Sequence, residues 1–99
     1  MNITDFKTIV KDSKLPVIAK FSAVWCGPCR MMTPIIDSIK KEQEGVIEVL
    51  SFDVDVDQEI ASDVGITSVP TIIIYRDGVE TNRLQGAKPK NVILEAVGI

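Results

Sequence analysis

Two cysteines separated by two residues are the strongest chemical feature of this sequence. They stand in the stretch Trp25-Cys26-Gly27-Pro28-Cys29 and are the only cysteines among the 99 residues. Thiols three positions apart at the start of a helix have Cβ atoms about 5–6 Å apart, so a small adjustment brings them to disulfide geometry. The pair can therefore cycle between dithiol and disulfide, which predicts thiol–disulfide exchange.

The expected positions of the two sulfurs give them different roles. Cys26 falls at the N-terminus of a predicted helix, where free N–H groups and the helix dipole lower the pKa of a thiol. Cys29 falls on the apolar face shared with Met32 and Ile36, so we expect it to be more buried and less ionised. Cys26 is thus predicted to attack a substrate disulfide, and Cys29 to attack the mixed disulfide and release the reduced substrate.

Three other interpretations of the spacing stay open at this point. A structural disulfide would close a loop of only four residues, for which chain entropy contributes roughly 2 kcal/mol. A zinc site needs four ligands, and the chain offers two thiols and no histidine, so a dimer would be required. The cysteines could also be two unrelated buried residues.

Composition and charge exclude several other classes of protein. With 99 residues, 45% hydrophobic and 25% charged, the chain is expected to form one globular domain over residues 1–99. The formal net charge of −3 argues against a phosphate-binding surface, so no nucleic acid is expected as a partner. Without histidine, a single chain cannot use Ser-His or Cys-His catalysis.

The N-terminal residues and the hydropathy pattern predict a cytoplasmic protein. Residues 1–7 lack a basic segment followed by an apolar one, so no signal peptide is expected. No apolar run approaches the length of a transmembrane helix, so no membrane association is expected. In the cytoplasm a close cysteine pair is more often catalytic or metal-binding than structural.

Apolar periodicity and turn signals predict the elements that hold the cysteines. The nearly continuous apolar segment 15–23 predicts a strand buried on both faces, followed by a helix at 26–44. Further strands are expected at 46–53 and, as a hairpin, at 71–75 and 79–84. Shorter helices are expected near the N-terminus with Thr4 as its cap, at 58–64, and after Pro89. This order predicts an α/β fold with helices on both faces of a mixed sheet.

The cysteine motif and several later segments resemble the thioredoxin family. Trp25–Cys29 follows an apolar strand, and Val69-Pro70-Thr71 stands where the family has its cis-proline segment. The resemblance covers nearly the whole chain and includes Phe21–Trp25, Pro34, Asp53-Val54-Asp55, Gly65–Thr71, Arg76-Asp77-Gly78 and Gly86-Ala87. It implies the thioredoxin fold, a central mixed sheet of four to five strands flanked by four helices.

The resemblance also implies an activity, partners and site residues. It implies a general protein disulfide reductase that works through a Cys26–Cys29 disulfide, with no bound cofactor and no metal. A thioredoxin reductase, using NADPH and flavin or another donor, would restore the dithiol after the chain reduces client proteins. The sequence gives no sign of obligate oligomerisation, so a monomer is expected. Gly27 and Pro28 would support the active site, and the Val69–Pro70 bond would be cis. The docking surface around Cys26 would comprise Trp25, Val69, Pro70, Gly86 and Ala87.

Lys20 departs from the family pattern. Typical members bury an aspartate at this position beneath the cysteines, and a neighbouring family lysine corresponds here to Ser51. That aspartate is thought to help deprotonate the second cysteine, which an ammonium group cannot do. Lys20 would instead stabilise thiolates by its charge, act as a base if burial lowers its pKa, or extend to water over apolar surface. Asp53, on the same side of its strand as Ser51, is a candidate partner for Lys20.

Two rival functions use the same residues differently. A disulfide-forming or isomerising protein of the same fold would run the exchange in the opposite direction, although Gly27-Pro28 and the lack of a signal peptide argue against it. A binding subunit would use the surface of Trp25 and Pro70 while its cysteines stay idle.

Overall fold

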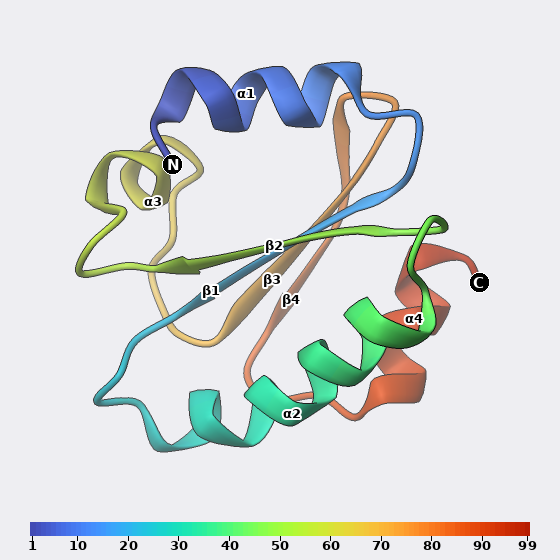
Figure 1. Cartoon of the computed structure of the whole chain (residues 1–99). Helices are drawn as coiled ribbons and strands as arrows, with labels where there is room; N and C mark the ends of the chain where they lie inside the picture. The colour runs from blue at the N-terminus through green and yellow to red at the C-terminus, as the bar shows by residue number, and fades with distance from the viewer.

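Four strands form one mixed sheet between two layers of helices (Figure 1). The computed structural model describes residues 1–99. β1 (Val17–Ser22) pairs in parallel with β2 (Glu48–Asp53) and antiparallel with β3 (Thr71–Arg76). β3 in turn pairs antiparallel with β4 (Val79–Gln85). The strand order is β2-β1-β3-β4. This confirms the predicted α/β class. The elements are α1 (Ile3–Asp12), β1 (Val17–Ser22), α2 (Gly27–Glu42), β2 (Glu48–Asp53), α3 (Gln58–Asp63), β3 (Thr71–Arg76), β4 (Val79–Gln85) and α4 (Lys90–Val97).

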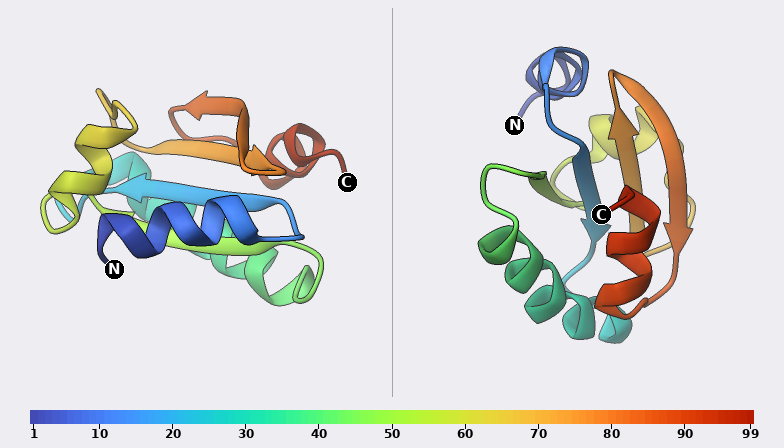
Figure 2. Two further views of the ribbon diagram at one scale, coloured as in Figure 1. Left: turned by 90° about the horizontal axis from the view of Figure 1, so that it is seen from above. Right: turned by 90° about the vertical axis from the view of Figure 1, so that its right-hand side faces the viewer.

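Each face of the sheet is covered by its own pair of helices, as the views in Figure 2 show. On the face of α1 and α3, Phe6 of α1 packs in one apolar cluster with Phe21 of β1. On the face of α2 and α4, Ile36 of α2 packs in another cluster with Ile72 of β3. Because β1 is an inner strand with both faces covered, residues 17–21 are all buried, as their nearly continuous apolar pattern predicts, and Lys20 is buried with them.

An aromatic cluster fixes β1, the strand that leads to the cysteines. Phe21 stacks on Phe52 of β2 with ring centroids 5.1 Å apart, and Phe6 meets Phe52 edge-on at 5.3 Å. Tyr75 of β3 adds a second edge contact to Phe6 at 6.1 Å. Burial raises the pKa of Tyr75 to about 12, so its hydroxyl is neutral at physiological pH. The cluster joins three strands and α1, and it holds the end of β1 in place.

α2 is the longest helix and carries the second cysteine. It continues through Pro34, and it buries Cys29, Met32, Ile36 and Ile39 against the sheet. With 16 residues it still falls short of a membrane span, and no helix of the structure has the length and apolar character that crossing a membrane requires.

Most element ends differ by one or two residues from the sequence prediction, and two of the differences have a clear local cause. The N-cap of α1 is Asn2 rather than Thr4, because the Asn2 side chain accepts the backbone N–H three residues later at 2.8 Å. The strand expected from residue 15 begins at Val17, because the hydroxyl of Ser13 bonds both the N–H and the carbonyl of Leu15 in a turn. Both differences come from local side-chain hydrogen bonds, which hydrophobic periodicity does not register.

Candidate active site

The cysteine pair lies where β1 ends and α2 begins. Cys26 is the N-cap of α2 and has an extended backbone, so the helix itself starts at Gly27. Pro28 sits in the first turn, where its missing N–H has no helical acceptor to lose. Cys26 and Cys29 are joined by a disulfide, with their Cα atoms 5.3 Å apart. The structure therefore brings together the two sulfurs that the spacing predicted to react.

The start of α2 favours a negative charge on Cys26. The backbone N–H of Cys29 donates to Cys26 Sγ at 3.3 Å. The first turn carries no acidic side chain that would oppose a thiolate. Free N–H groups and the helix dipole act in the same direction at an N-cap. These features together make the position of Cys26 Sγ favourable for a negative charge.

The surroundings of the two cysteines distinguish them better than their burial does. Cys26 is 5% exposed and Cys29 is 3% exposed, so the expected difference in burial is small. Cys26 Sγ lies 3.8 Å from the carbonyl oxygen of Val69. Cys29 lines a pocket to which neither Cys26 nor Val69 contributes. The two sulfurs therefore have different neighbours.

A groove of about 480 Å³ adjoins the active site and is lined by Trp25 and Val69. Trp25 is 66% exposed, and its indole N–H donates to Asp55 Oδ2 at 2.8 Å. Asp55 is itself held in place, because its backbone N–H donates to Asp53 Oδ1 at 2.8 Å. Sequence reasoning found Trp25 and Val69 but gave Asp55 no role. It also missed the rest of the lining, which is Val54, Gln58, Ala61, Ser62, Ile66, Thr67 and Ser68.

The segment before β3 carries the cis peptide bond that the resemblance implied, between Val69 and Pro70. Pro70 is buried, and its carbonyl accepts the N–H of Gly86 at 2.9 Å. Gly86 has φ +86°, which a side chain would disfavour. The N–H of Val69 makes no hydrogen bond within the chain. A backbone donor is therefore left free close to Cys26.

Four of the five predicted docking residues are linked through these contacts, and Ala87 is the exception. Trp25 shares a groove with Val69, and Gly86 is bonded to Pro70. Ala87 is exposed and lines a different, mostly apolar groove of about 320 Å³. The other lining residues of that groove are Met31, Met32, Ile35, Lys88 and Pro89. Ala87 thus lies at the edge of the site rather than in the groove of Trp25.

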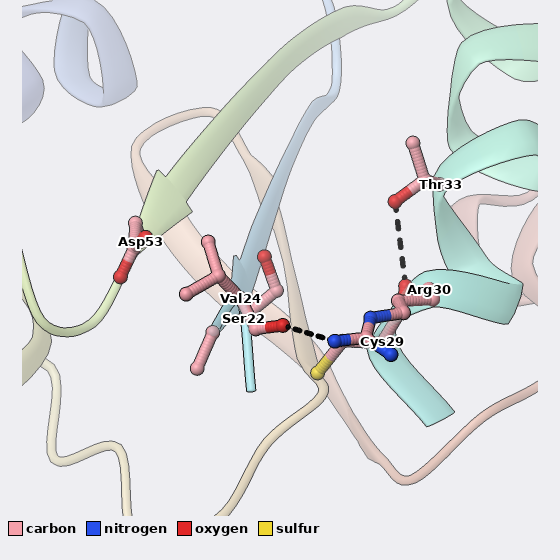
Figure 3. A pocket seen from close by; sticks show the side chains of 7 residues that line it. Ser22, Val24, Cys29, Arg30, Thr33 and Asp53 are labelled. Carbon is pink, nitrogen blue, oxygen red and sulfur yellow. Dashed lines mark hydrogen bonds between the residues drawn. The ribbon is translucent and has the colours of Figure 1, made fainter. Parts of the chain in front are cut away.

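The Cys29 pocket is a cavity of about 350 Å³ (Figure 3). Arg30 donates from Nη2 to the carbonyl oxygen of Val24 at 3.0 Å, and Thr33 Oγ1 donates to the carbonyl oxygen of Cys29 at 3.4 Å. Asp53 is the only carboxylate in the lining. The complete lining is Ser22, Ala23, Val24, Cys29, Arg30, Thr33 and Asp53.

Lys20 is buried in the sheet and has no partner. It is 7% exposed and lies between Ser51 of β2 and Ile72 of β3. It forms no ion pair or hydrogen bond, so the expected pairing with Asp53 is wrong. Because every fully buried side-chain nitrogen and oxygen has a partner, the Nζ of Lys20 must reach solvent. The aliphatic stem is buried in the sheet, and only the end of the side chain reaches the surface.

The side chains present do not form a metal site. No group of three or more Cys, Asp or Glu side chains is close enough to hold a metal ion. The two thiols that a zinc site would use are bonded to each other.

Comparisons with known proteins agree with this geometry. The family model of thioredoxin matches residues 1–98. The thioredoxin of Rickettsia felis is 45% identical over 96 residues, which cover 95% of this chain and 91% of that protein. Thioredoxin 1 of a Nostoc species is 40% identical over 97 residues, with coverage of 96% and 91%.

A solved structure gives the same result at the level of the fold. It comes from a study of the thiol resolving mechanism in yeast mitochondrial 1-Cys peroxiredoxin via glutathione and thioredoxin systems. It superposes with a TM-score of 0.87 at 26% identity, and covers 99% of this chain and 91% of that one. The family match and the disulfide-bonded cysteine pair together show that the chain belongs to the thioredoxin family and is a protein dithiol–disulfide oxidoreductase.

Proposed function

We propose that this chain is a general reductant of protein disulfides, with Cys26 as the attacking thiol and Cys29 as the resolving thiol. The observation that carries the proposal is the position of Cys26. It caps α2, and its sulfur lies 3.8 Å from the carbonyl oxygen of Val69, beside a groove and a free backbone N–H. Cys29 stands one turn deeper, bonded to Cys26 and away from that groove.

A client protein would bind as an extended segment across this surface. The N–H of Val69 is available to pair with a client carbonyl, as in the addition of a strand to a sheet edge. Trp25 offers a rigid aromatic surface, since its indole is anchored on Asp55. Pro70 and Gly86 fix the backbone behind Val69. Binding through the client backbone and apolar side chains accepts many sequences, which suits a general reductant.

The exchange then runs in two steps. The Cys26 thiolate attacks one client sulfur, the client disulfide breaks, and its second sulfur leaves as a thiolate that takes up a proton. Cys29 next attacks Cys26 Sγ in the mixed disulfide, and the first client sulfur leaves in the same way. The client gains two electrons, and the chain ends with the Cys26–Cys29 disulfide seen in the structure.

The wider setting belongs to the same proposal. A thioredoxin reductase, drawing on NADPH and flavin or another donor, would restore the dithiol after each cycle. We propose a monomer, one domain over residues 1–99, in the cytoplasm, with no bound cofactor. Relatives named thioredoxin, matched over more than nine-tenths of their length, support this assignment.

Reduction of insulin tests the proposed function. With dithiothreitol as the electron source, we expect catalytic amounts of the chain to accelerate the precipitation of the freed insulin chains. A rate equal to that of dithiothreitol alone would contradict reductase function.

Lys20 is proposed to support the active site through its charge. Its side chain leaves β1 on the α2 side of the sheet, as that of Ile18 does, so its ammonium lies on the side of the cysteines. Because Nζ reaches the surface, where solvent screens its charge, the effect should be small. In Lys20→Met we expect thiolate formation, followed by ultraviolet absorbance, to move to higher pH by roughly a few tenths of a unit. Lys40→Met, at the far end of α2, serves as the control, and an unchanged titration in Lys20→Met would refute the effect.

A further inference from the structure

The resolving step requires the Cys29 thiol to lose a proton inside the protein. Cys29 is 3% exposed, so its thiol can meet water only through the pocket that it lines. Lys20, on the strand beneath the cysteines, offers no carboxylate that could take this proton. If the pair resolves mixed disulfides as proposed above, another group must take this proton.

The Cys29 pocket is the opening through which the proton can leave. Its volume of about 350 Å³ is enough for several water molecules. Among its lining residues Asp53 is the only carboxylate and Arg30 the only cation. Figure 3 shows Asp53 at the end of β2 and Cys29 at the start of α2, with Ser22 and Val24 between them in this view. A proton can therefore cross the pocket by way of water to a fixed carboxylate.

Asp53 is held in place while one of its oxygens stays free. Oδ1 accepts the backbone N–H of Asp55 at 2.8 Å, and the backbone N–H of Asp53 donates to Asp57 Oδ2 at 3.1 Å. Oδ2 of Asp53 has no hydrogen bond and no ion pair within the chain. The residue is half-buried and lies next to Ser22 in the sheet register. This combination gives a positioned acceptor.

We propose that Asp53 accepts the Cys29 proton, through water in the Cys29 pocket, during resolution of the mixed disulfide. The proton passes from Cys29 Sγ to the Asp53 carboxylate as Cys29 Sγ forms its bond to Cys26 Sγ. The bond between Cys26 and the client sulfur breaks, and the client leaves as a thiolate. The proton on Asp53 then returns through water to that thiolate, so charge and electrons balance. Arg30 supplies a positive charge at the same pocket, which favours the negative charge that develops on Cys29 Sγ as its proton leaves.

Several charged groups lie around the pocket, and a test must distinguish their effects from that of Asp53. Lys20 lies on the neighbouring strand on the α2 side, Arg30 comes from α2, and Asp55 and Asp57 follow β2. Asp57 does not line the pocket, although it bonds the backbone of Asp53. Asp57→Asn therefore changes the net charge by the same amount as Asp53→Asn and leaves the proposed acceptor in place.

The test follows the two cysteines separately in one stopped-flow experiment. Reduced protein is mixed with an equimolar amount of 5,5′-dithiobis(2-nitrobenzoate). The coloured thiol released by Cys26 appears in a concentration-dependent phase, and that released by Cys29 in a concentration-independent phase. In Asp53→Asn we expect the second phase at pH 7 to slow by about tenfold, the low end of general-base effects. The rate of the first phase should stay within about twofold of the wild-type rate. The slowing of the second phase should shrink as the pH approaches about 8.5, where a thiol ionises unaided.

The choice of variants separates proton transfer from structure. The side-chain amide oxygen in Asp53→Asn would still accept the Asp55 N–H, so the turn is kept while the proton acceptor is lost. Asp53→Glu should restore the second phase, and Asp57→Asn should leave both phases unchanged. A second phase in Asp53→Asn with the wild-type rate and pH profile would overturn the proposal. So would an equal slowing of both phases that Asp53→Glu fails to rescue. A wild-type protein that shows no second phase would refute the proposed function instead.

Discussion

Cys29→Ser is expected to trap client proteins as stable mixed disulfides on Cys26. The variant keeps the N-cap of α2 and the groove beside it, so the first attack proceeds. The hydroxyl that replaces the Cys29 thiol cannot resolve the adduct, and turnover should fall by at least about a thousandfold. Non-reducing electrophoresis of the variant incubated with an oxidised client should show a heavier band that disappears with dithiothreitol.

Cys26→Ser is the matched control for that experiment. It should form no adduct at comparable rates, because Cys29 lines a separate pocket and lacks the N-cap position. Adducts on Cys29 in this variant would reverse the assigned roles. Full biological activity of Cys26→Ser would support a binding subunit, whose cysteines stay idle, over a reductase.

Trp25→Ala is expected to weaken the reduction of protein disulfides far more than that of small ones. Trp25 is 66% exposed beside Cys26 and is anchored on Asp55, which makes it a preorganised contact for a client. Loss of such an aromatic anchor typically costs about 2 kcal/mol, or roughly 30-fold in affinity. We expect kcat/KM for insulin to fall by about that factor, while the rate with 5,5′-dithiobis(2-nitrobenzoate) changes less than about threefold.

Val79→Ala provides the control for loss of exposed apolar surface. Val79 is 62% exposed and begins β4, at the end of the hairpin opposite Pro70 and Gly86. It should leave both rates unchanged. Equal losses with insulin and with the small disulfide in Trp25→Ala would assign Trp25 to the chemistry rather than to docking.

The elements and the reactive pair were predictable because their signals are local. The apolar run in β1, the glycine and proline positions, and the Cys26–Cys29 spacing each follow from neighbouring residues. They correctly predicted a strand, then a helix with the cysteines at its start, and a hairpin at the end of the sheet. The exceptions were ends such as the cap of α1, where Asn2 and Thr4 are both suitable residues and only the hydrogen bond decides.

Contacts between distant segments were not predictable in this way. The bond from Trp25 to Asp55 spans 30 positions, and that from Gly86 to Pro70 joins the residue after β4 to the residue before β3. The cis state of Pro70 followed only from the resemblance, since most X-Pro bonds are trans. Periodicity measures burial and says nothing of which polar groups meet.

Lys20 and Asp53 show where strand alternation succeeds and where it stops. Alternation correctly placed both side chains on one side of the sheet, since Lys20 pairs with Ser51 and Asp53 lies two residues further. It could not show that Lys20 would form no ion pair, or that Oδ1 of Asp53 would bond the N–H of Asp55. The balance between hydration and pairing decides such contacts, and it depends on the full three-dimensional surroundings.

The reduction potential of the Cys26–Cys29 pair tests most directly whether this chain is a reductant. It can be measured by equilibrating the protein with glutathione buffers and quantifying its dithiol and disulfide forms. A general reductant should lie near the value of thioredoxin, about −270 mV, with Lys20 moving it slightly upward. A value above about −200 mV, in the range of disulfide isomerases and oxidants, would contradict the account.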